Sequence, residues 1–541
     1  MTVNKPEPRL IIIGAGIAGI ALASRVRFEL GYQNFTIFER ESDIGGTWHL
    51  NTYPGVGCDV DSHLYSFSFN PNPNWSQRFA EQPEILQYLH NTAEKFGVRP
   101  HVQLRTEVVE ATWIAEKNVW RVDLKDMENG HKYTCEAEML VSCVGTISIP
   151  KDCNIPNHEV YKGALFHSAR WDHSFDYEGK HVAIVGNGCS GAQLMPRVAE
   201  KASKVIQFQR SPQWLNDRPN PKISEFRKFC FRYVPLYGRL YRYWLWRSTD
   251  MLHGLYITGD ISLERQRAEH QAIAERYMRE TAPKRYHDIL IPTFPLGCKR
   301  RVFDPGYLAA LHRSNVELTT ERIVEFTPTG LRTSKRDIDV DGVVLSTGFK
   351  IQEFLSPIQV IGTEKSLNEH WKDTRGAQAY KATFVHGFPN FGIVFGPNAF
   401  PAHNSVIYTN ETQAEYIIKA LIKPVLQGHF SVMDVKQAAE TYHSNHVQKR
   451  LENMVWNEGC ANWNLNSAGR NTTNYHDPTW KFWWDLYWPV WSDFNLYGGK
   501  GTVPTSPWTK FGLRLGAASV IIGLALRCWW QGLHYGSYFH S

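Results

Sequence analysis

Two glycine-rich turns, each set between an apolar strand and a helical segment, constrain the fold of this chain most strongly. The first turn, GAGIAG at residues 14–19, follows the apolar run 9–13 and precedes an amphipathic segment, after which the strand FTIFER begins. Glycines at this spacing permit a tight turn, let a pyrophosphate approach the backbone and allow close helix packing. An acid at the end of the second strand would accept a hydrogen bond from a ribose hydroxyl. The pattern predicts a βαβ dinucleotide site that uses Gly14, Gly16, Gly19 and Glu39.

The second turn, GNGCSG at residues 186–191, opens another βαβ unit. Its second strand ends in Arg210 and Ser211 instead of an acid. A carboxylate would repel a 2′-phosphate, whereas a guanidinium pairs with it in bidentate fashion. This site is therefore predicted to take NADP in preference to NAD, and a surface arginine at a strand end is the alternative. Its glycines are Gly186, Gly188 and Gly191.

Two dinucleotide folds in one chain favour a flavin that is reduced by a nicotinamide. With 541 residues, the chain has room for two or three domains. Disulfide reductases pass electrons from the flavin to a close cysteine pair, but the nine cysteines include no CxxC pair. The cysteine pattern favours a reducing compartment and leaves oxygen or a small electron acceptor to reoxidise the flavin.

Composition narrows the choice of partners. Charged residues make up 21% of the chain and apolar residues 43%, as in globular proteins. The net charge of +6 is not gathered into one basic block, which argues against nucleic acid and favours anionic small molecules. A basic and aromatic stretch at 222–248 is predicted to be a helical insert with a solvated face; a nucleic-acid or membrane surface is the alternative. The 22 histidines show no HExxH or Cys/His ligand spacing, so no metal site is predicted.

The two ends of the chain carry different predictions. No apolar signal core precedes the first strand, which favours a cytoplasmic protein. Near the other end, the apolar run 515–526 lies between Arg514 and Arg527 and is shorter than the ~17 to 25 residues of a spanning helix. No acidic residue follows Asp493, a balance that suits an anionic membrane surface. A buried or capping helix is preferred for this run, and membrane association through the tail is the alternative.

The segment YKGALFHSARWD at residues 161–172 joins the two nucleotide folds. With Gly163, His167, Trp171 and Asp172 it resembles the F-x-G-x-x-x-H-x-x-x-W-(P/D) fingerprint of single-chain, FAD-containing Baeyer–Villiger monooxygenases, and Tyr161 replaces the usual phenylalanine. The related flavin-containing monooxygenases usually lack the tryptophan that is followed by proline or aspartate. The resemblance implies that the fingerprint lies on the linker between domains, where the histidine and tryptophan tie linker motion to the nicotinamide. Packing of an interdomain seam is the alternative.

Other segments agree with this resemblance. GGTWHLNTYPGVGCD at 45–59 matches the family element G-G-x-W-x4-(F/Y)-P-G-x3-D, and GCKRRVFDPGYLAAL at 297–311 resembles the segment that delivers the active-site arginine. We assign that arginine to Arg300, with Arg301 as the adjacent alternative. VVLSTGF, GPNAFPAHNSV and GCANWNLNSAGRNTTNY resemble later family segments, although Tyr475 stands where a tryptophan is common.

The resemblance covers residues 9–490 and implies an α/β fold with two dinucleotide-binding Rossmann-like domains, the NADP domain inserted in the FAD domain, and a helical subdomain. The implied divisions are 1–148 for the first part of the FAD-binding domain, 149–218 for the first part of the NADP-binding domain, 219–292 for the helical insert, 293–380 for the second part of the NADP-binding domain and the return to the FAD domain, 381–500 for the second part of the FAD-binding domain, and 501–541 for an apolar basic tail.

The resemblance also implies the chemistry. NADPH reduces FAD, oxygen adds to give a peroxyflavin, and this attacks a ketone to yield an ester or lactone. Arg300 would hold the developing negative charge, and Asp59 would orient the Arg300 guanidinium. A structural salt bridge is the alternative for Arg300 and Asp59. His167 is the third predicted catalytic residue, through its link to the nicotinamide. Further FAD contacts are expected from Thr47, Trp48, Asp59, Val60 and Tyr65, and a further NADP contact from Lys299.

Three functions stay open at this point. The first is oxidation of a ketone, which the aromatic insert suggests to be large and apolar, such as an intermediate of secondary metabolism. The second is oxygenation of sulfur or nitrogen by the same peroxyflavin. The third is a flavoprotein that no longer oxygenates and serves as an NADPH oxidase or a binding partner, against which the complete fingerprint argues.

Overall fold

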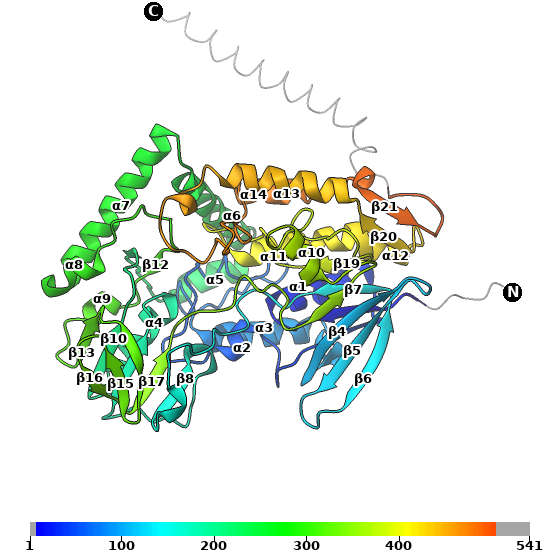
Figure 1. The fold of residues 1–541 in the computed structure, drawn as a ribbon. Helices are drawn as coiled ribbons and strands as arrows, with labels where there is room; N and C mark the ends of the chain where they lie inside the picture. The colour runs from blue at the N-terminus through cyan, green and yellow to red at the C-terminus, as the bar shows by residue number, and fades with distance from the viewer. Residues whose placement is uncertain (1–6, 505–541) are drawn as a thin grey trace, which may run out of the picture.

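The computed structural model describes residues 7–504, and the first glycine-rich turn lies in its first parallel sheet, of order β19-β7-β1-β2-β3 (Figure 1). Every residue of β1, β7 and β19 is buried, because both faces of a parallel sheet are covered. Strand β19 pairs with β7, so distant parts of the chain build one sheet. The strands are β1 (Leu10–Ile13), β2 (Phe35–Phe38), β3 (Val102–Gln103), β7 (Met139–Ser142) and β19 (Phe391–Ile393).

Helices and a second layer cover this sheet. Helix α1 packs against α3 and α11, and a sheet of order β18-β4-β5-β6 lies against the other side through a shared apolar core. Trp120 of β5 is fully buried in that core and donates to the Pro389 carbonyl at 2.8 Å. The elements are α1 (Ile17–Leu30), α2 (Thr47–Leu50), α3 (Gln82–Lys95), α11 (Val406–Ile417), β4 (Thr106–Ile114), β5 (Val119–Asp126), β6 (Lys132–Ala137) and β18 (Gln359–Ile361).

The second glycine-rich turn lies in another parallel sheet, of order β13-β10-β9-β17-β8. Figure 1 shows it at the left, with β7 and β19 of the first sheet to the right of centre. Helix α4 begins at Cys189, within the turn, and a small antiparallel sheet follows β13. The elements are β8 (Ala164–His167), β9 (His181–Val185), α4 (Cys189–Ala199), β10 (Lys204–Phe208), α9 (Tyr307–Ala310), β13 (Val316–Thr319), β14 (Ile323–Thr327), β15 (Gly330–Thr333), β16 (Asp337–Asp339) and β17 (Gly342–Leu345).

The stretch between α4 and α9 contains a helical insertion. The chain leaves at β11 and returns at β12, which pair in parallel through Leu215 and Val302, so the insertion begins and ends at one place. Side chains start two of its helices: Ser224 accepts from the Arg227 amide, and Asp260 accepts from the Ser262 amide. The elements are β11 (Leu215–Asn216), α5 (Glu225–Tyr233), α6 (Tyr237–Asp250), α7 (Ile261–Thr281), α8 (His287–Leu290) and β12 (Val302–Phe303).

The C-terminal part of the described chain is mostly helical and packs on the first sheet, at the top in Figure 1. A five-residue π-helical turn, Ile418–Ile422, continues α11 into α12. The remaining elements are α10 (Leu367–Asp373), α12 (Lys423–Leu426), β20 (Val432–Val435), α13 (Gln437–Leu451), α14 (Thr479–Asp485) and β21 (Phe494–Tyr497). Between residues 7 and 504, no helix combines the length and apolarity needed to cross a membrane. The predictions for the run 515–526 lie outside the described residues.

Candidate active site

A cavity of about 1200 Å³ lies where the strands of both parallel sheets end. Residues directly after β1, β2, β9, β10 and β17 line it, which is the edge at which parallel sheets bind ligands. The predicted residues that line it are Gly14, Gly16, Glu39, Thr47, Trp48, Asp59, Val60, Tyr65, His167, Gly186, Gly188, Arg210, Ser211, Lys299 and Arg300. Gly19 and Gly191 do not line it, and neither does Arg301.

The first turn accepts only glycine at two of its positions. Gly14 has φ +96°, and a Cβ there would lie 2.9 Å from the Cys143 carbonyl oxygen. A Cβ on Gly19 would lie 2.0 Å from the Gly14 oxygen, so this glycine lets α1 pack against the turn. Glu39 directly follows β2 and accepts from the Ala15 amide at 2.8 Å. Burial raises the pKa of Glu39, and that hydrogen bond opposes the rise.

The second turn repeats this geometry. Gly186 has φ +112°, and a Cβ there would lie 2.4 Å from the Ser346 carbonyl oxygen. A Cβ on Gly191 would lie 2.3 Å from the Gly186 oxygen. Gly188 differs, because a Cβ on it would meet no atom within 4 Å and would project into open space beside the cavity. Both turns therefore leave room for a dinucleotide to approach the backbone.

A cationic corner forms beside the second turn. Lys299 Nζ donates to Ser211 Oγ at 2.7 Å, although 88 positions separate the two residues. Arg210 is exposed at the cavity, and its charge, together with burial, lowers the pKa of Lys299. Two cations and a hydroxyl at one corner suit an anion such as a 2′-phosphate.

Arg300 and Asp59 meet on the cavity wall from distant segments. Arg300 Nη2 donates to Asp59 Oδ2 at 2.5 Å, and the guanidinium lies 5.5 Å from the centroid of the Phe400 ring. Burial raises the pKa of Asp59, but the charge and hydrogen bond of Arg300 outweigh it, so the net pKa is lowered. Asp59 in turn raises the pKa of Arg300, which stays charged. Arg301 lies instead near the Phe303 ring.

The 45–59 segment forms the wall between the two turns. Trp48, buried in α2, donates from Nε1 to the Tyr65 hydroxyl at 3.2 Å. Tyr53 donates to Gln193 Oε1 at 2.8 Å, and Gln193 Nε2 donates to the Gly57 carbonyl at 2.9 Å. These two bonds tie the wall to α4, and Gln193 itself lines the cavity. Sequence reasoning missed this link; Tyr53 stands at the aromatic position of the family element, but no motif pointed to Gln193.

The fingerprint residues divide between two places. His167, the last residue of β8, lines the cavity; its Nδ1 accepts from the Ala169 amide at 3.1 Å and its buried Nε2 has no protein partner among the described residues. Burial lowers the pKa of His167 to about 4, so the ring is neutral at pH 7. Trp171 does not line the cavity and packs against Phe166 and Tyr177, which belong to the same predicted part of the NADP-binding domain. Residues 164–167 form an edge strand of the second sheet instead of a free linker.

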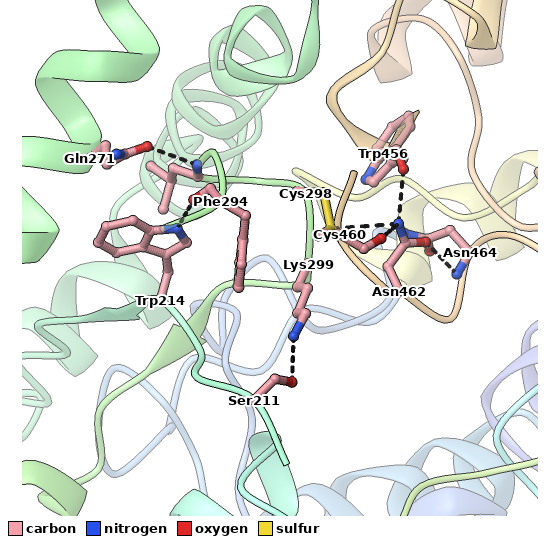
Figure 2. The surroundings of a disulfide bond; sticks show 11 residues. Ser211, Trp214, Gln271, Phe294, Cys298, Lys299, Trp456, Cys460, Asn462 and Asn464 are labelled. Atoms are coloured by element: carbon pink, nitrogen blue, oxygen red, sulfur yellow. Dashed lines mark hydrogen bonds between the residues drawn. A yellow bond between two sulfur atoms is a disulfide. The ribbon is translucent and has the colours of Figure 1, made fainter. Parts of the chain in front are cut away.

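A disulfide joins Cys298 to Cys460, with their Cα atoms 6.2 Å apart (Figure 2). It fastens the residue before Lys299 to a loop whose Asn462 donates to the Trp456 and Cys460 carbonyls. The cysteine spacing did not predict this pair, because 162 positions separate the two cysteines. The cysteine pattern indicates a reducing compartment, but these two cysteines are not reduced in this structure. The loop lines the cavity through Asn462 and Trp463, so the disulfide lies close to the site.

Comparison with known proteins identifies a family of flavin-dependent monooxygenases. A family model described as flavin-binding monooxygenase-like matches residues 7–223. The FAD-binding monooxygenase ktnD of Aspergillus niger is 33% identical, covering 96% of this chain and 90% of that protein. Baeyer–Villiger monooxygenases of Pseudomonas aeruginosa and Streptomyces coelicolor are 33% and 34% identical, each covering 88% of this chain and 88% or 90% of their own length.

Solved structures share the fold over most of the chain. The OTEMO complex with FAD and NADP superimposes with a TM-score of 0.80 at 26% identity, covering 91% of this chain and all of that one. A steroid monooxygenase bound to NADP gives 0.77 at 26% identity with the same coverage. A closed cyclohexanone monooxygenase, at 22% identity, gives 0.79 and covers 91% of this chain and 99% of its own. Fold and site thus define a flavin-dependent monooxygenase. The chain belongs to the Baeyer–Villiger monooxygenases of the flavin-binding monooxygenase-like family.

Proposed function

We propose that this protein uses FAD, NADPH and O2 to insert one oxygen atom next to a ketone carbonyl, giving an ester or a lactone. The observation that carries the proposal is the position of Arg300, which pairs with Asp59 in a cavity that both glycine-rich turns reach. The solved relatives that hold FAD and NADP support both cofactors here.

The two turns divide the cofactors between them. The first turn and Glu39 would hold FAD, and the second turn would hold NADPH with its phosphate at Arg210, Ser211 and Lys299. The domain divisions predicted from the sequence are part of this proposal, and the two separate parallel sheets support them. Bound FAD, once reduced by NADPH, supplies the oxygen-activating chemistry.

The protein's own contribution is charge and position. Arg300 is a cation that cannot lose its proton at neutral pH, so it can stabilise negative charge that develops on the substrate oxygen. Asp59 orients the guanidinium, and about a third of the Arg300 side chain stays accessible to a ligand. Because Nδ1 of the neutral His167 ring accepts from the Ala169 amide, the ring proton lies on Nε2, which can donate a hydrogen bond to a bound ligand.

The substrate that we propose is a large apolar ketone, consistent with a role in secondary metabolism. Phe400 lies next to Arg300 and packs against Phe395 and Trp463, and all three apolar side chains line the cavity. The cytoplasm, which supplies NADPH, is the compartment that we propose. Disulfides are rare in the cytoplasm, so the redox state of Cys298 and Cys460 in cells tests the proposed location.

A labelled-oxygen experiment tests the proposed reaction. The purified holoprotein is incubated with NADPH, ¹⁸O₂ and ketones of increasing size, and products are analysed by mass spectrometry. An ester or lactone that carries one ¹⁸O atom supports the proposal. Sulfoxides or N-oxides from thioethers or amines, with no ester from any ketone, would move the function to heteroatom oxygenation. Hydrogen peroxide as the sole product would identify an NADPH oxidase.

A further inference from the structure

Two helices of the insertion expose an apolar stripe. Each stripe follows helical spacing, with Phe226, Phe229 and Tyr233 on α5 and Leu240, Tyr243 and Trp244 on α6. The side chains are far from buried: Phe226 is 75% exposed and Leu240 is 65% exposed. A solvated helix face is normally polar, so a contiguous apolar surface of this kind indicates a partner.

The opposite sides of the same helices are anchored in the protein. Phe231 of α5 stacks on His63 with ring centroids 3.9 Å apart, and Arg242 of α6 donates to the His63 and Leu64 carbonyls. Trp246 Nε1 donates to Thr479 Oγ1 at 3.0 Å, at the start of α14. The orientation of the exposed stripe is therefore fixed by contacts on the inner side.

Helix α14 lies next to this surface, because exposed Tyr243 of the α6 stripe packs against Trp246, which contacts α14. The bond between Trp246 and Thr479 holds α6 beside α14, and Figure 1 shows the two helices at the upper side of the molecule. Trp480 and Trp484 are 47% and 58% exposed. We call the whole surface the aromatic face; it comprises Phe226, Phe229, Tyr233, Val234, Leu236, Leu240, Tyr243, Trp244, Trp480, Trp483 and Trp484.

Exposed charges within residues 222–250 are mostly basic. Lys222, Arg232, Arg239 and Arg247 are exposed, whereas the exposed acid Glu225 already binds Lys228. The buried Asp250 accepts hydrogen bonds from Thr479 and does not reach the surface. Surfaces that combine tryptophan and tyrosine with arginine bind at the interface between lipid headgroups and acyl chains.

The chain beyond the described residues has the same character. Trp491 Nε1 donates to the Pro504 carbonyl, where the described chain ends, a short distance along the chain from α14. From Phe494 to the C-terminus there is no acidic residue, and the apolar run 515–526 lies between two arginines. Apolar and basic residues without acids suit an anionic lipid surface.

We propose that the aromatic face is a peripheral docking surface for an anionic lipid bilayer. The inserted aromatic side chains supply apolar contact, and Arg232, Arg239 and Arg247 supply attraction to the headgroups. The helices lie on the bilayer and do not span it. On the inner side of α6, the Trp246 carbonyl lies 3.4 Å from the side-chain nitrogen of Asn404, which lines the cavity, so docking would bring the active site close to a lipid phase.

The test is cosedimentation of the full-length holoprotein with vesicles of phosphatidylcholine alone or mixed with phosphatidylglycerol. Binding is expected with the mixed vesicles and is expected to weaken as the ionic strength rises. The F226Q/L240Q variant should bind the mixed vesicles at least about tenfold more weakly than the wild type. The control V109Q/M127Q changes two exposed apolar side chains outside the insertion, 38% and 45% exposed, and should bind like the wild type. Replacing the three arginines by glutamine should weaken binding roughly fivefold for each charge.

Flavin content and the unfolding temperature, measured on every variant, show that the fold is intact. Unchanged binding of F226Q/L240Q would overturn the proposal. No binding to mixed vesicles, together with a dimer in sedimentation velocity that F226Q/L240Q dissociates, would overturn it in favour of a contact between copies. These outcomes do not depend on which substrate the enzyme oxidises.

Discussion

Replacing Gly191 by alanine tests the NADP site through a steric clash that the structure defines. The added Cβ would lie 2.3 Å from the Gly186 oxygen and 3.1 Å from Gln207 Nε2, whereas ordinary contact begins at 3.4 Å. The Gly186 oxygen cannot yield freely, because it accepts from Gln207 Nε2 at 2.9 Å. Helix α4 and the turn must therefore separate by about 1 Å.

Overpacking of this kind costs about 1–3 kcal/mol of stability. The turn that moves is also the predicted NADP cradle, so we expect the KM for NADPH to rise at least tenfold, which is about 1.4 kcal/mol of binding. Gly188→Ala is the matched control in the same turn. It meets no atom within 4 Å and has an ordinary φ of −71°, so it should lose only the small preference for glycine over alanine at the N-cap of α4, and less stability than Gly191→Ala.

The two variants should nevertheless share one defect. A Cβ on residue 188 projects to where a pyrophosphate would approach, so Gly188→Ala should also raise the KM for NADPH. Thermal unfolding by circular dichroism and steady-state NADPH oxidation measure the two properties. Wild-type stability in Gly191→Ala would refute the packing argument, and unchanged KM in both variants would refute the assignment of the turn to NADPH.

Four further predictions address other parts of the site. Arg300→Ala should lower oxygenated product about 100-fold to 1000-fold, while Arg301→Ala, outside the cavity, should keep most activity; equal losses would contradict the assignment. Arg210→Ala should raise the KM for NADPH and leave the KM for NADH unchanged, measured in parallel assays. Equal changes in both KM values would contradict binding of the 2′-phosphate by Arg210. Cys460→Ser should raise the KM for NADPH more than it lowers kcat, because the loop is then no longer fastened beside Lys299, and Cys230→Ser, a free cysteine, is the control. The free energy of unfolding should fall as the pH drops from about 6.5 to about 4. Burial or partial burial lowers the pKa of His63, His167 and His253 to about 4, so they stay neutral in the fold while the unfolded chain takes up protons. Denaturant unfolding at pH 7 and pH 5 measures this loss, and a smaller loss in His63→Asn would support the cause.

Local spacing was enough to predict the two nucleotide-binding units. The turns at 14–19 and 186–191 work through the strand before and the helix after, so each prediction needs only about 30 neighbouring residues. The structure places Gly14 and Gly186 at positive φ, and Gly19 and Gly191 against a carbonyl, where only glycine fits. The resemblance to a known family added the choice of Arg300, which local pattern alone could not separate from Arg301.

The site itself depends on contacts between distant segments. Only the fold shows that Lys299 reaches Ser211, that Arg300 reaches Asp59, and that Cys298 and Cys460 lie close enough to bond.

The physical reason for this division is the range over which each constraint acts. A glycine turn is decided by backbone sterics within a few residues, and the sequence by itself determines it. Which side chain faces the cavity, and whether an aromatic stripe on α5 and α6 is buried or exposed, depends on how separate elements pack. The sequence thus determined the two dinucleotide folds and their ligand class, and the tertiary structure decided which charges meet in one cavity and which apolar face is left uncovered.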